Sequence, residues 1–536
     1  MEAANLQIYW HESQPIYSLC FQPAPSEATG NRRLVTAGGD NKIRVWQLNF
    51  SEENKYKVDT IDFLSSLTQH EQAVNVARFD SKGEILATAG DDGLLLLWKK
   101  NNTIVKEFGI DDEEFADFKE SWYILKRLRP SSSSGASEVY DLCWSPDNRY
   151  IVTGSMDNTV RIFDTEDGSC ISQTLGHSHY VQGVVWDPQD EFIISQSADR
   201  SVHIYKIIRD QEKGLVGLKL SNKITKGDLP CRKTSDPKEL DRNSLKTAYL
   251  FHNETLPSFF RRLTMSPCGS LLCVPTGIFK NSESGSESNS SEFANAVYIY
   301  TRSSLVHSSN KPVICLPFLK KPALAISFNP NYYKLTKNSL PCINLPYKLV
   351  YAVATSNEVL IYDTESVKPL AVIGNLHYTP LTDINWCQDG NLLMISSTDG
   401  FCSYVSIKDG LLGEVWTDST TTLERDDVAA KADKKGVMAN SVNHLVTKRK
   451  NCSKDHKTSV SETKTKKAKK VTSTIASETS TVDPVSSKND ATDKKNDTLQ
   501  PHSQEPKLTD QKASAANVNE KPKRRVQPIL VSKETK

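Results

Sequence analysis

The chain has 536 residues, and its 66 basic and 65 acidic side chains leave a formal net charge of +1 at pH 7. No apolar run reaches the roughly 18–20 residues that span a bilayer, and the first residues lack the basic and apolar regions of a secretory signal, so we expect no membrane contact. The 11 cysteines are scattered and form no CxxC pair, which indicates free thiols in a reducing compartment.

The first half of the chain repeats a short phrase. The four copies are TAGGDNKIRVW at 36–46, TAGDDGLLLLW at 88–98, TGSMDNTVRIF at 153–163 and SQSADRSVHIY at 195–205. Each copy is an apolar run, a tight turn that an Asp opens, and a second run that ends in an aromatic residue. Polar and apolar residues alternate around the turn, which is the period of a β-strand.

Seven repeat units of this kind follow one another along the chain. We place them at 16–46, 70–98, 138–164, 176–206, 259–302, 325–364 and 377–407, although the fifth and sixth have lost the turn Asp. Units of about 40 residues with four strands are typical of propeller blades, so the sequence predicts an all-β, seven-bladed propeller over 1–415.

Three further expectations concern the connections of this propeller. The seventh unit ends soon after its third strand, so we expect the N-terminal LQIYW at 6–10 to be its outer strand and to close the ring. The polar spacers at 101–137, 207–258 and 279–293 are interpreted as loops on the faces. The unit at 176–206, with Gly176-His177 and VVWDPQDEFIISQSAD, resembles a nearly complete WD repeat.

One set of side chains suggests nucleophilic catalysis, because it combines His70, the hydroxyl of Thr88 and Asp92. The His-to-Asp spacing argues against that interpretation: 92−70, 199−177 and 399−377 all equal 22. A spacing that recurs in three units indicates a feature of the repeat. The resemblance to WD repeats implies buried hydrogen-bond sets, whose members are His70, Thr88, Asp92 and Trp98 in the second unit and His177, Ser195 and Asp199 in the fourth.

By this interpretation only the second unit contains all four members of the set. We find no unrepeated convergent polar set, no metal-ligand spacing and no phosphate-binding glycine loop. The sequence therefore predicts a protein that is not an enzyme and that has no catalytic residue, metal or cofactor.

Residues 416–536 are rich in Lys, Ser, Thr, Asp and Asn, and predict a disordered tail. A basic cluster in it consists of Lys464, Lys466, Lys467, Lys469 and Lys470. Such a cluster is typical of a nuclear import signal or of weak phosphate contacts, so we expect DNA to be bound weakly or only indirectly.

A second basic cluster, in the segment 522–532, leads into the one apolar patch of the tail. Basic residues followed by apolar anchors suit the addition of a strand to an acidic partner, although an import signal beside apolar residues would look similar. The segment resembles the B-domain motif by which histone-regulator and chromatin-assembly WD proteins bind the anti-silencing-function histone chaperone. The residues concerned are Arg524, Arg525, Val526, Pro528, Ile529, Leu530 and Val531.

Several phrases outside the WD consensus resemble the middle-subunit family of chromatin assembly factor 1. They lie at 177–188, 250–277, 345–365 and 381–407. The resemblance implies a nuclear subunit of a histone chaperone complex that deposits histones H3/H4 onto newly replicated or repaired DNA. It implies the large and small subunits of that complex as partners. The alternatives are a subunit of a replication-independent histone chaperone and a substrate receptor of a ubiquitin ligase.

Overall fold

The computed structural model describes residues 1–23, 32–51, 56–106, 110, 112–129, 137–211, 214–232, 240–280, 293–336 and 341–416. Within these residues it contains thirty strands and two five-residue helices, α1 (Asp112–Ala116) and α2 (Arg302–Val306). None of the described helices is long and apolar enough to cross a membrane.

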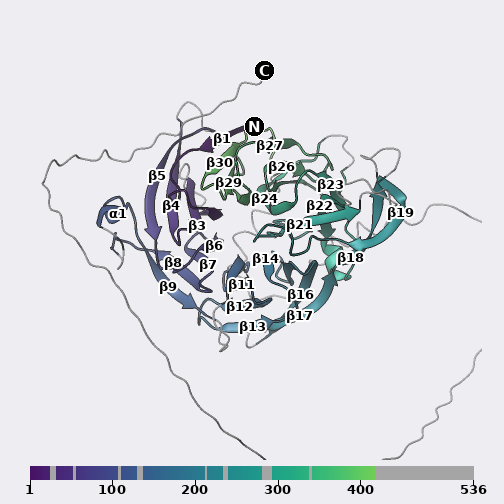
Figure 1. The fold of residues 1–536 in the computed structure, drawn as a ribbon, viewed down its shortest axis with the longest axis horizontal. Helices are drawn as coiled ribbons and strands as arrows, with labels where there is room; N and C mark the ends of the chain where they lie inside the picture. Colours follow the sequence, from purple (N-terminus) through teal and green to yellow (C-terminus); the bar gives the residue numbers. More distant parts are fainter. Residues whose placement is uncertain are drawn as a thin grey trace, which may run out of the picture. The chain divides into compact units, whose positions relative to one another are not determined.

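The described strands form seven four-stranded antiparallel sheets, which follow one another around a ring (Figure 1). The first three sheets are β2 (Ile16–Phe21) to β5 (Val58–Leu67), β6 (Val74–Phe79) to β9 (Trp122–Leu128), and β10 (Val139–Trp144) to β13 (Cys170–Thr174); their middle strands are β3 (Arg32–Gly38), β4 (Ile43–Phe50), β7 (Ile85–Gly90), β8 (Leu95–Lys100), β11 (Tyr150–Ser155) and β12 (Val160–Asp164). The predicted all-β, seven-bladed propeller is confirmed.

The remaining blades follow the same order. The fourth has β14 (Val181–Trp186), β15 (Phe192–Ser197), β16 (Ser201–Asp210) and β17 (Gly214–Ile224), and the fifth has β20 (Thr264–Met265), β21 (Leu271–Lys280), β22 (Phe293–Thr301) and β23 (Ile314–Leu319). The sixth has β24 (Ala323–Tyr333), β25 (Lys348–Thr355), β26 (Glu358–Asp363) and β27 (Ala371–Gly374), and the seventh has β28 (Leu381–Trp386), β29 (Leu392–Ser397), β30 (Cys402–Ser406) and β1 (Glu2–Leu6).

The hydrophobic cores lie between neighbouring blades. One core cluster joins Val35 and Val45 of the first blade to Phe79, Leu86 and Trp98 of the second. Because each blade is covered on both faces, strands such as β14 and β15 are buried along their whole length. This is the reason that the repeated phrase begins with a continuous apolar run.

Asp residues open the turns between the second and third strands, as the repeated phrase predicts. In the β3–β4 turn the Asp40 carboxylate accepts the Lys42 amide at 3.2 Å, and Asn41 adopts a positive φ of 62°. In the β7–β8 turn Asp92 accepts the Leu94 amide at 3.0 Å, and Gly93 has a φ of 67°. Asn and Gly tolerate this left-handed conformation better than other residues.

The ring is closed by β1, which pairs antiparallel with β30 from Glu2↔Ser406 to Leu6↔Cys402. The two strands lie side by side where the N-terminal and C-terminal blades meet (Figure 1). The sequence predicts this strand at 6–10, and that position is wrong. Trp10 is fully buried in the core between the first and seventh blades, and its indole donates to the Leu6 carbonyl at 3.1 Å. Core packing explains the apolar residues Ile8 and Trp10, which lie beyond the paired strand.

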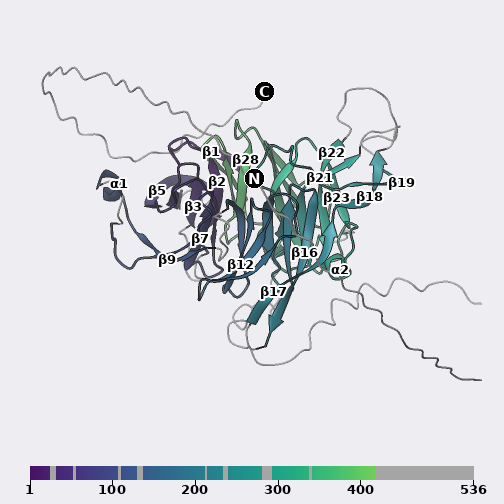
Figure 2. The ribbon, with the colours of Figure 1, turned by 60° about the horizontal axis from the view of Figure 1, so that its bottom comes forward.

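Two spacers for which the sequence predicts loops contain strands. Residues 101–137 include α1 and β9, and residues 207–258 include β17 and a separate hairpin of β18 (Lys226–Arg232) and β19 (Leu240–Tyr249). The β16–β17 hairpin projects beyond the neighbouring strands (Figure 2).

The propeller also extends one residue beyond the predicted boundary at 415. The Trp416 amide donates to the Tyr332 carbonyl at 2.9 Å, and its ring centroid lies 5.1 Å from that of Tyr347. The rest of the predicted tail, from residue 417 onward, lies outside the described residues.

Candidate functional site

The second blade contains the hydrogen-bond set that the sequence singles out. His70 precedes β6, Thr88 lies on β7, Asp92 opens the next turn and Trp98 lies on β8. The His70 Nδ1 atom is 2.8 Å from the Asp92 carboxylate, and its Nε2 atom is 2.8 Å from the Thr88 hydroxyl. The Trp98 indole donates to the same hydroxyl at 2.8 Å. The structure thus brings all four side chains together.

The contacts of this set stabilise the ionised form of Asp92. Burial opposes ionisation of Asp92, but the hydrogen bond from His70, the charge of that ring and two backbone amides outweigh burial and hold the pKa of the carboxyl below its usual range. Thr88 is fully buried, and its oxygen already contacts two nitrogen atoms. A hydroxyl that is buried and already hydrogen-bonded to two nitrogen atoms cannot approach a substrate. The set instead forms a buried hydrogen-bond network that stabilises the turn at Asp92.

The fourth blade repeats the arrangement with one change. His177 lies 3.0 Å from Asp199 and 2.7 Å from the Ser195 hydroxyl, while Tyr205 stands where the second blade has Trp. The ring of His203 stacks on that of His177 at a centroid distance of 3.7 Å. Burial, together with the neighbouring His177, lowers the pKa of His203 to about 3.

His177, Asp199 and His203 form the one group of the described residues whose atoms lie close enough to suggest a metal. The two imidazole rings are stacked with an interplanar angle of only 12°. Ring nitrogens coordinate in the plane of the ring, so the lone pairs of two parallel rings do not converge on one ion. His177 also uses both nitrogens for hydrogen bonds within the blade. The geometry of this group does not fit a metal site.

The first blade contains a second complete set, which the sequence interpretation missed. His11 lies 2.6 Å from Asp40 and 2.8 Å from the Thr36 hydroxyl, and the Trp46 indole donates to that hydroxyl at 2.9 Å. The His-to-Asp spacing is 40−11 = 29 here, because the connection between β2 and β3 is longer than that between β6 and β7. The distance of ten residues from Thr36 to Trp46, the same as from Thr88 to Trp98, is the signal that could have revealed it.

The seventh blade completes its set with a hydroxyl from another strand. His377 contacts Asp399 at 3.0 Å, and its Nε2 atom lies 2.8 Å from the Ser403 hydroxyl. Ser403 on β30 is paired directly across from Ile395 on β29, which occupies the position of the usual hydroxyl residue. The repeat thus preserves the hydrogen bond although the sequence position has changed.

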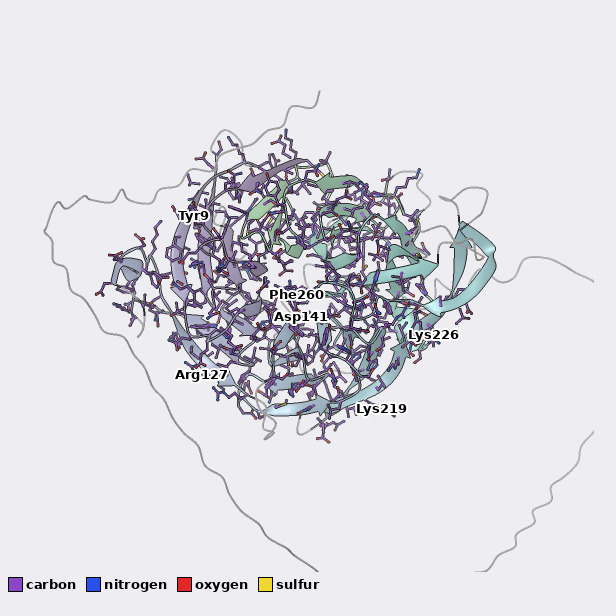
Figure 3. All side chains as sticks on the ribbon, viewed as in Figure 1. Tyr9, Arg127, Asp141, Lys219, Lys226 and Phe260 are labelled. Carbon is purple, nitrogen blue, oxygen red and sulfur yellow. The ribbon has the colours of Figure 1, made fainter. Side chains whose placement is uncertain are left out.

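A buried ionic cluster crosses the axis of the propeller. Arg78, Arg262, Asp141 and Asp383 come from four different blades, and Asp141 lies near the centre of the ring in Figure 3. Arg78 is 2.9 Å from Asp383, and Arg262 is 3.3 Å from Asp383 and 3.7 Å from Asp141. Burial opposes the charge of Asp383, but the two guanidinium groups hold its pKa below the usual range.

Arg262 also joins blades through backbone carbonyls. Its guanidinium donates to the carbonyls of Tyr17 at 3.0 Å, Asn75 at 2.7 Å and Thr382 at 2.9 Å, which lie in the first, second and seventh blades. The ring of Phe260 lies over the guanidinium at 4.2 Å. The cluster therefore connects the innermost strands of several blades. Its four side chains also line an open cavity of about 420 Å³.

The remaining site residues predicted from the sequence lie outside the described residues. They are the peptide residues Arg524, Arg525, Val526, Pro528, Ile529, Leu530 and Val531, and the basic cluster of Lys464, Lys466, Lys467, Lys469 and Lys470.

Comparison with known proteins identifies the family to which the sequence is similar. Residues 1–412 match the model of the CAF1B/HIR1 β-propeller domain. The chain is 48% identical to a chromatin assembly factor 1 subunit of Saccharomyces cerevisiae over 76% of its length and 86% of that protein. It is 40% identical to the corresponding subunit of Schizosaccharomyces pombe, over 77% of this chain and 89% of the relative, and 35% identical to that of Mus musculus, over 77% and 68%.

Proposed function

The chain belongs to the CAF1B/HIR1 β-propeller family, and we propose that it is the propeller subunit of a chromatin assembly factor 1 histone chaperone complex. In this role it supports the deposition of histones H3/H4 onto newly replicated or repaired DNA. The observation that carries the proposal is the match of 48% identity that extends over 86% of a known chromatin assembly factor 1 subunit.

The proposed role is that of a non-enzymatic scaffold. The hydrogen-bond sets that could be mistaken for catalytic groups are buried, and they recur in the first, second, fourth and seventh blades. Repeated rigid blades instead present loops and edges to partners. The partners we propose are the large and small subunits of the complex, with histones H3/H4 bound directly or through them.

The tail supplies two further parts of the proposal. We propose that the segment 522–532 binds the anti-silencing-function histone chaperone through Arg524, Arg525 and the apolar residues that follow. The lysine cluster around Lys464 to Lys470 would direct the chain to the nucleus, where the complex acts. DNA would be contacted only weakly or through the complex.

Affinity purification of the full chain from dividing cells, followed by mass spectrometry, tests the assembly. We expect a large subunit and a second WD protein that binds histones to be recovered together with the chain. Recovery of ubiquitin-ligase adaptors without either subunit would refute the proposal. Recovery of the subunits of a replication-independent chaperone would instead favour the HIR1 branch, to which a Kluyveromyces lactis protein of 22% identity belongs by name.

The same purification tests the tail peptide with a matched pair of variants. Arg524→Ala/Arg525→Ala should lose the anti-silencing chaperone and keep the other two subunits. Lys494→Ala/Lys495→Ala removes the same amount of charge from a part of the tail outside both clusters and should keep all three partners. Chaperone binding that survives the arginine change would remove the peptide from the proposal and leave the assignment to the complex standing.

A further inference from the structure

Aromatic side chains from four blades meet on one face of the propeller, around its axis. Tyr17 is at the start of β2, Tyr140 is at the start of β10, Tyr180 directly precedes β14, and Phe259 and Phe260 precede β20. These are the innermost strands of their blades, and all of them run in the same direction along the axis because every blade repeats the same order. Residues at their N-terminal ends therefore share one face, and Phe260 lies near the centre of the ring in Figure 3.

The five rings form a continuous belt, which we call the aromatic belt. Successive ring centroids are 5.9 Å apart from Tyr180 to Tyr140, 6.3 Å from Tyr140 to Phe259, 6.4 Å from Phe259 to Phe260 and 5.8 Å from Phe260 to Tyr17. Phe259 is 61% exposed, and Tyr17 and Tyr180 are partly exposed, while the buried rings of Tyr140 and Phe260 hold these three in place. An apolar ring that is held in place by its neighbours and still faces solvent is typical of a contact surface.

Two carboxylates without a cation border the belt. Glu138 accepts the Tyr140 hydroxyl at 3.0 Å, and Asp91 accepts the Asn75 amide at 2.6 Å. Burial and the nearby carboxylates of Glu138 and Asp92 raise the pKa of Asp91, so the negative charges are crowded together. In the described part of the chain neither Asp91 nor Glu138 forms an ion pair with a lysine or arginine.

Other acidic residues on the same face do have a cation. The turn residue Asp40 lies 2.7 Å from the guanidinium of Arg44, and Asp157 is paired with Arg161. The two carboxylates beside the aromatic belt differ from Asp40 and Asp157 in that no arginine or lysine contact compensates their charge in the described residues. A ligand that complements these carboxylates must bring positive charge.

Rings beside carboxylates suit the side chains of arginine and lysine. Their aliphatic stems pack on an aromatic surface, their charge interacts with the ring face, and the carboxylate accepts their N–H groups. The inner face of Phe260 already shows this chemistry, because Arg262 lies over it at 4.2 Å.

We propose that the aromatic belt, with Asp91 and Glu138, binds a segment of a partner protein that carries several arginine or lysine residues. This surface goes beyond the proposed function and does not depend on it, because the argument uses only the contacts of this face. It is also separate from the tail peptide, which would bind a different partner.

Fluorescence anisotropy of the full-length chain with a labelled peptide of about ten residues, in which arginine and alanine alternate, tests the proposal. The wild-type chain should bind this peptide at about 0.15 M salt and should not bind the same peptide with glutamate in place of arginine. Asp91→Asn/Glu138→Gln should weaken binding about tenfold, because two charge-assisted contacts are lost. Phe259→Ala should weaken it about threefold.

Matched control variants carry the same chemical changes on outer strands. Asp59→Asn on β5 and Tyr123→Ala on β9 alter an exposed carboxylate and an exposed ring away from the belt, and should change binding less than twofold. Unchanged melting temperatures establish that all variants fold. The proposal is overturned if the wild-type chain does not bind the basic peptide, as would occur if its own tail filled the belt. Equal binding of the glutamate peptide, or equal losses in the control variants, would also overturn it.

Discussion

Arg262 offers the sharpest test of how this propeller is held closed. Replacing it with Met keeps the length and the apolar stem of the side chain but removes the guanidinium. Three buried carbonyls in the first, second and seventh blades, at 2.7–3.0 Å, then lose a charged donor. Asp141 loses the cation at 3.7 Å, while Asp383 keeps Arg78 at 2.9 Å.

The expected loss follows from these contacts. A buried acceptor that loses its partner costs about 1–3 kcal/mol, and breaking one side of a buried ion pair costs about 3–5 kcal/mol. These contributions are not additive, and water from the adjoining cavity of about 420 Å³ can satisfy part of the lost bonding. We therefore expect Arg262→Met to lower the free energy of unfolding by about 3–5 kcal/mol, and Arg262→Lys by about 2 kcal/mol because one ammonium group can replace only some of the contacts.

Urea unfolding followed by tryptophan fluorescence and by circular dichroism measures this loss. The matched control is Arg209→Met, which breaks the half-exposed pair between Arg209 and Asp190 and should cost less than about 1 kcal/mol. Asp141→Asn added to Arg262→Met removes the buried carboxylate that has lost its ion pair, so the double variant should be no less stable than Arg262→Met alone. An Arg262→Met chain as stable as the Arg209→Met control would refute the view that this residue ties the blades together.

Three further predictions concern the blades themselves. Thr88→Val should lower the free energy of unfolding by about 2–4 kcal/mol, because two buried nitrogen atoms lose their partner, and Thr36→Val should cost a similar amount by the same urea assay; a neutral result at either position would contradict the bracing role. The pKa of His203 is about 3 in the folded chain and about 6.5 in the unfolded chain, so as the pH falls the unfolded state takes up the proton first. Above pH 6.5 the neutral ring does not oppose folding, but at pH 5 it should lower the free energy of unfolding by about 2 kcal/mol. His203→Gln should remove that part of the pH dependence, and identical pH profiles for variant and wild type would show that the pKa of His203 does not differ between the folded and unfolded chain. Leu6→Asp places a charge at the one buried position of the closing strand and should release β1, which light scattering would detect as aggregation through the exposed edge of β30; a monomeric variant of unchanged stability would count against closure by this strand.

The central axis and the closing strand explain why part of this architecture escapes prediction from sequence. Arg262 contacts residues that are 120 to 245 positions away in the chain, and no local pattern distinguishes it from its neighbour Arg261. The strand that closes the ring has the weakly apolar sequence EAANL, whereas Ile8 and Trp10 of the more apolar LQIYW, which overlaps it at Leu6, enter the core. Strand pairing across 400 residues depends on backbone groups that every sequence offers, so hydrophobicity alone points to the wrong segment.

Features that depend on neighbouring residues could be predicted from the sequence. The alternation of apolar residues, the Asp-opened turns and the spacing of 22 between His and Asp are local, and they are sufficient to predict seven blades and to assign His70, Thr88, Asp92 and Trp98 to one repeat. Three features emerge only when the chain is folded: which strand closes the ring, the replacement of the missing hydroxyl of the seventh blade by Ser403, and the meeting of five rings and two carboxylates at the axis. These contacts join strands whose positions are set by closure of the ring, so no local stretch of sequence contains the information for them.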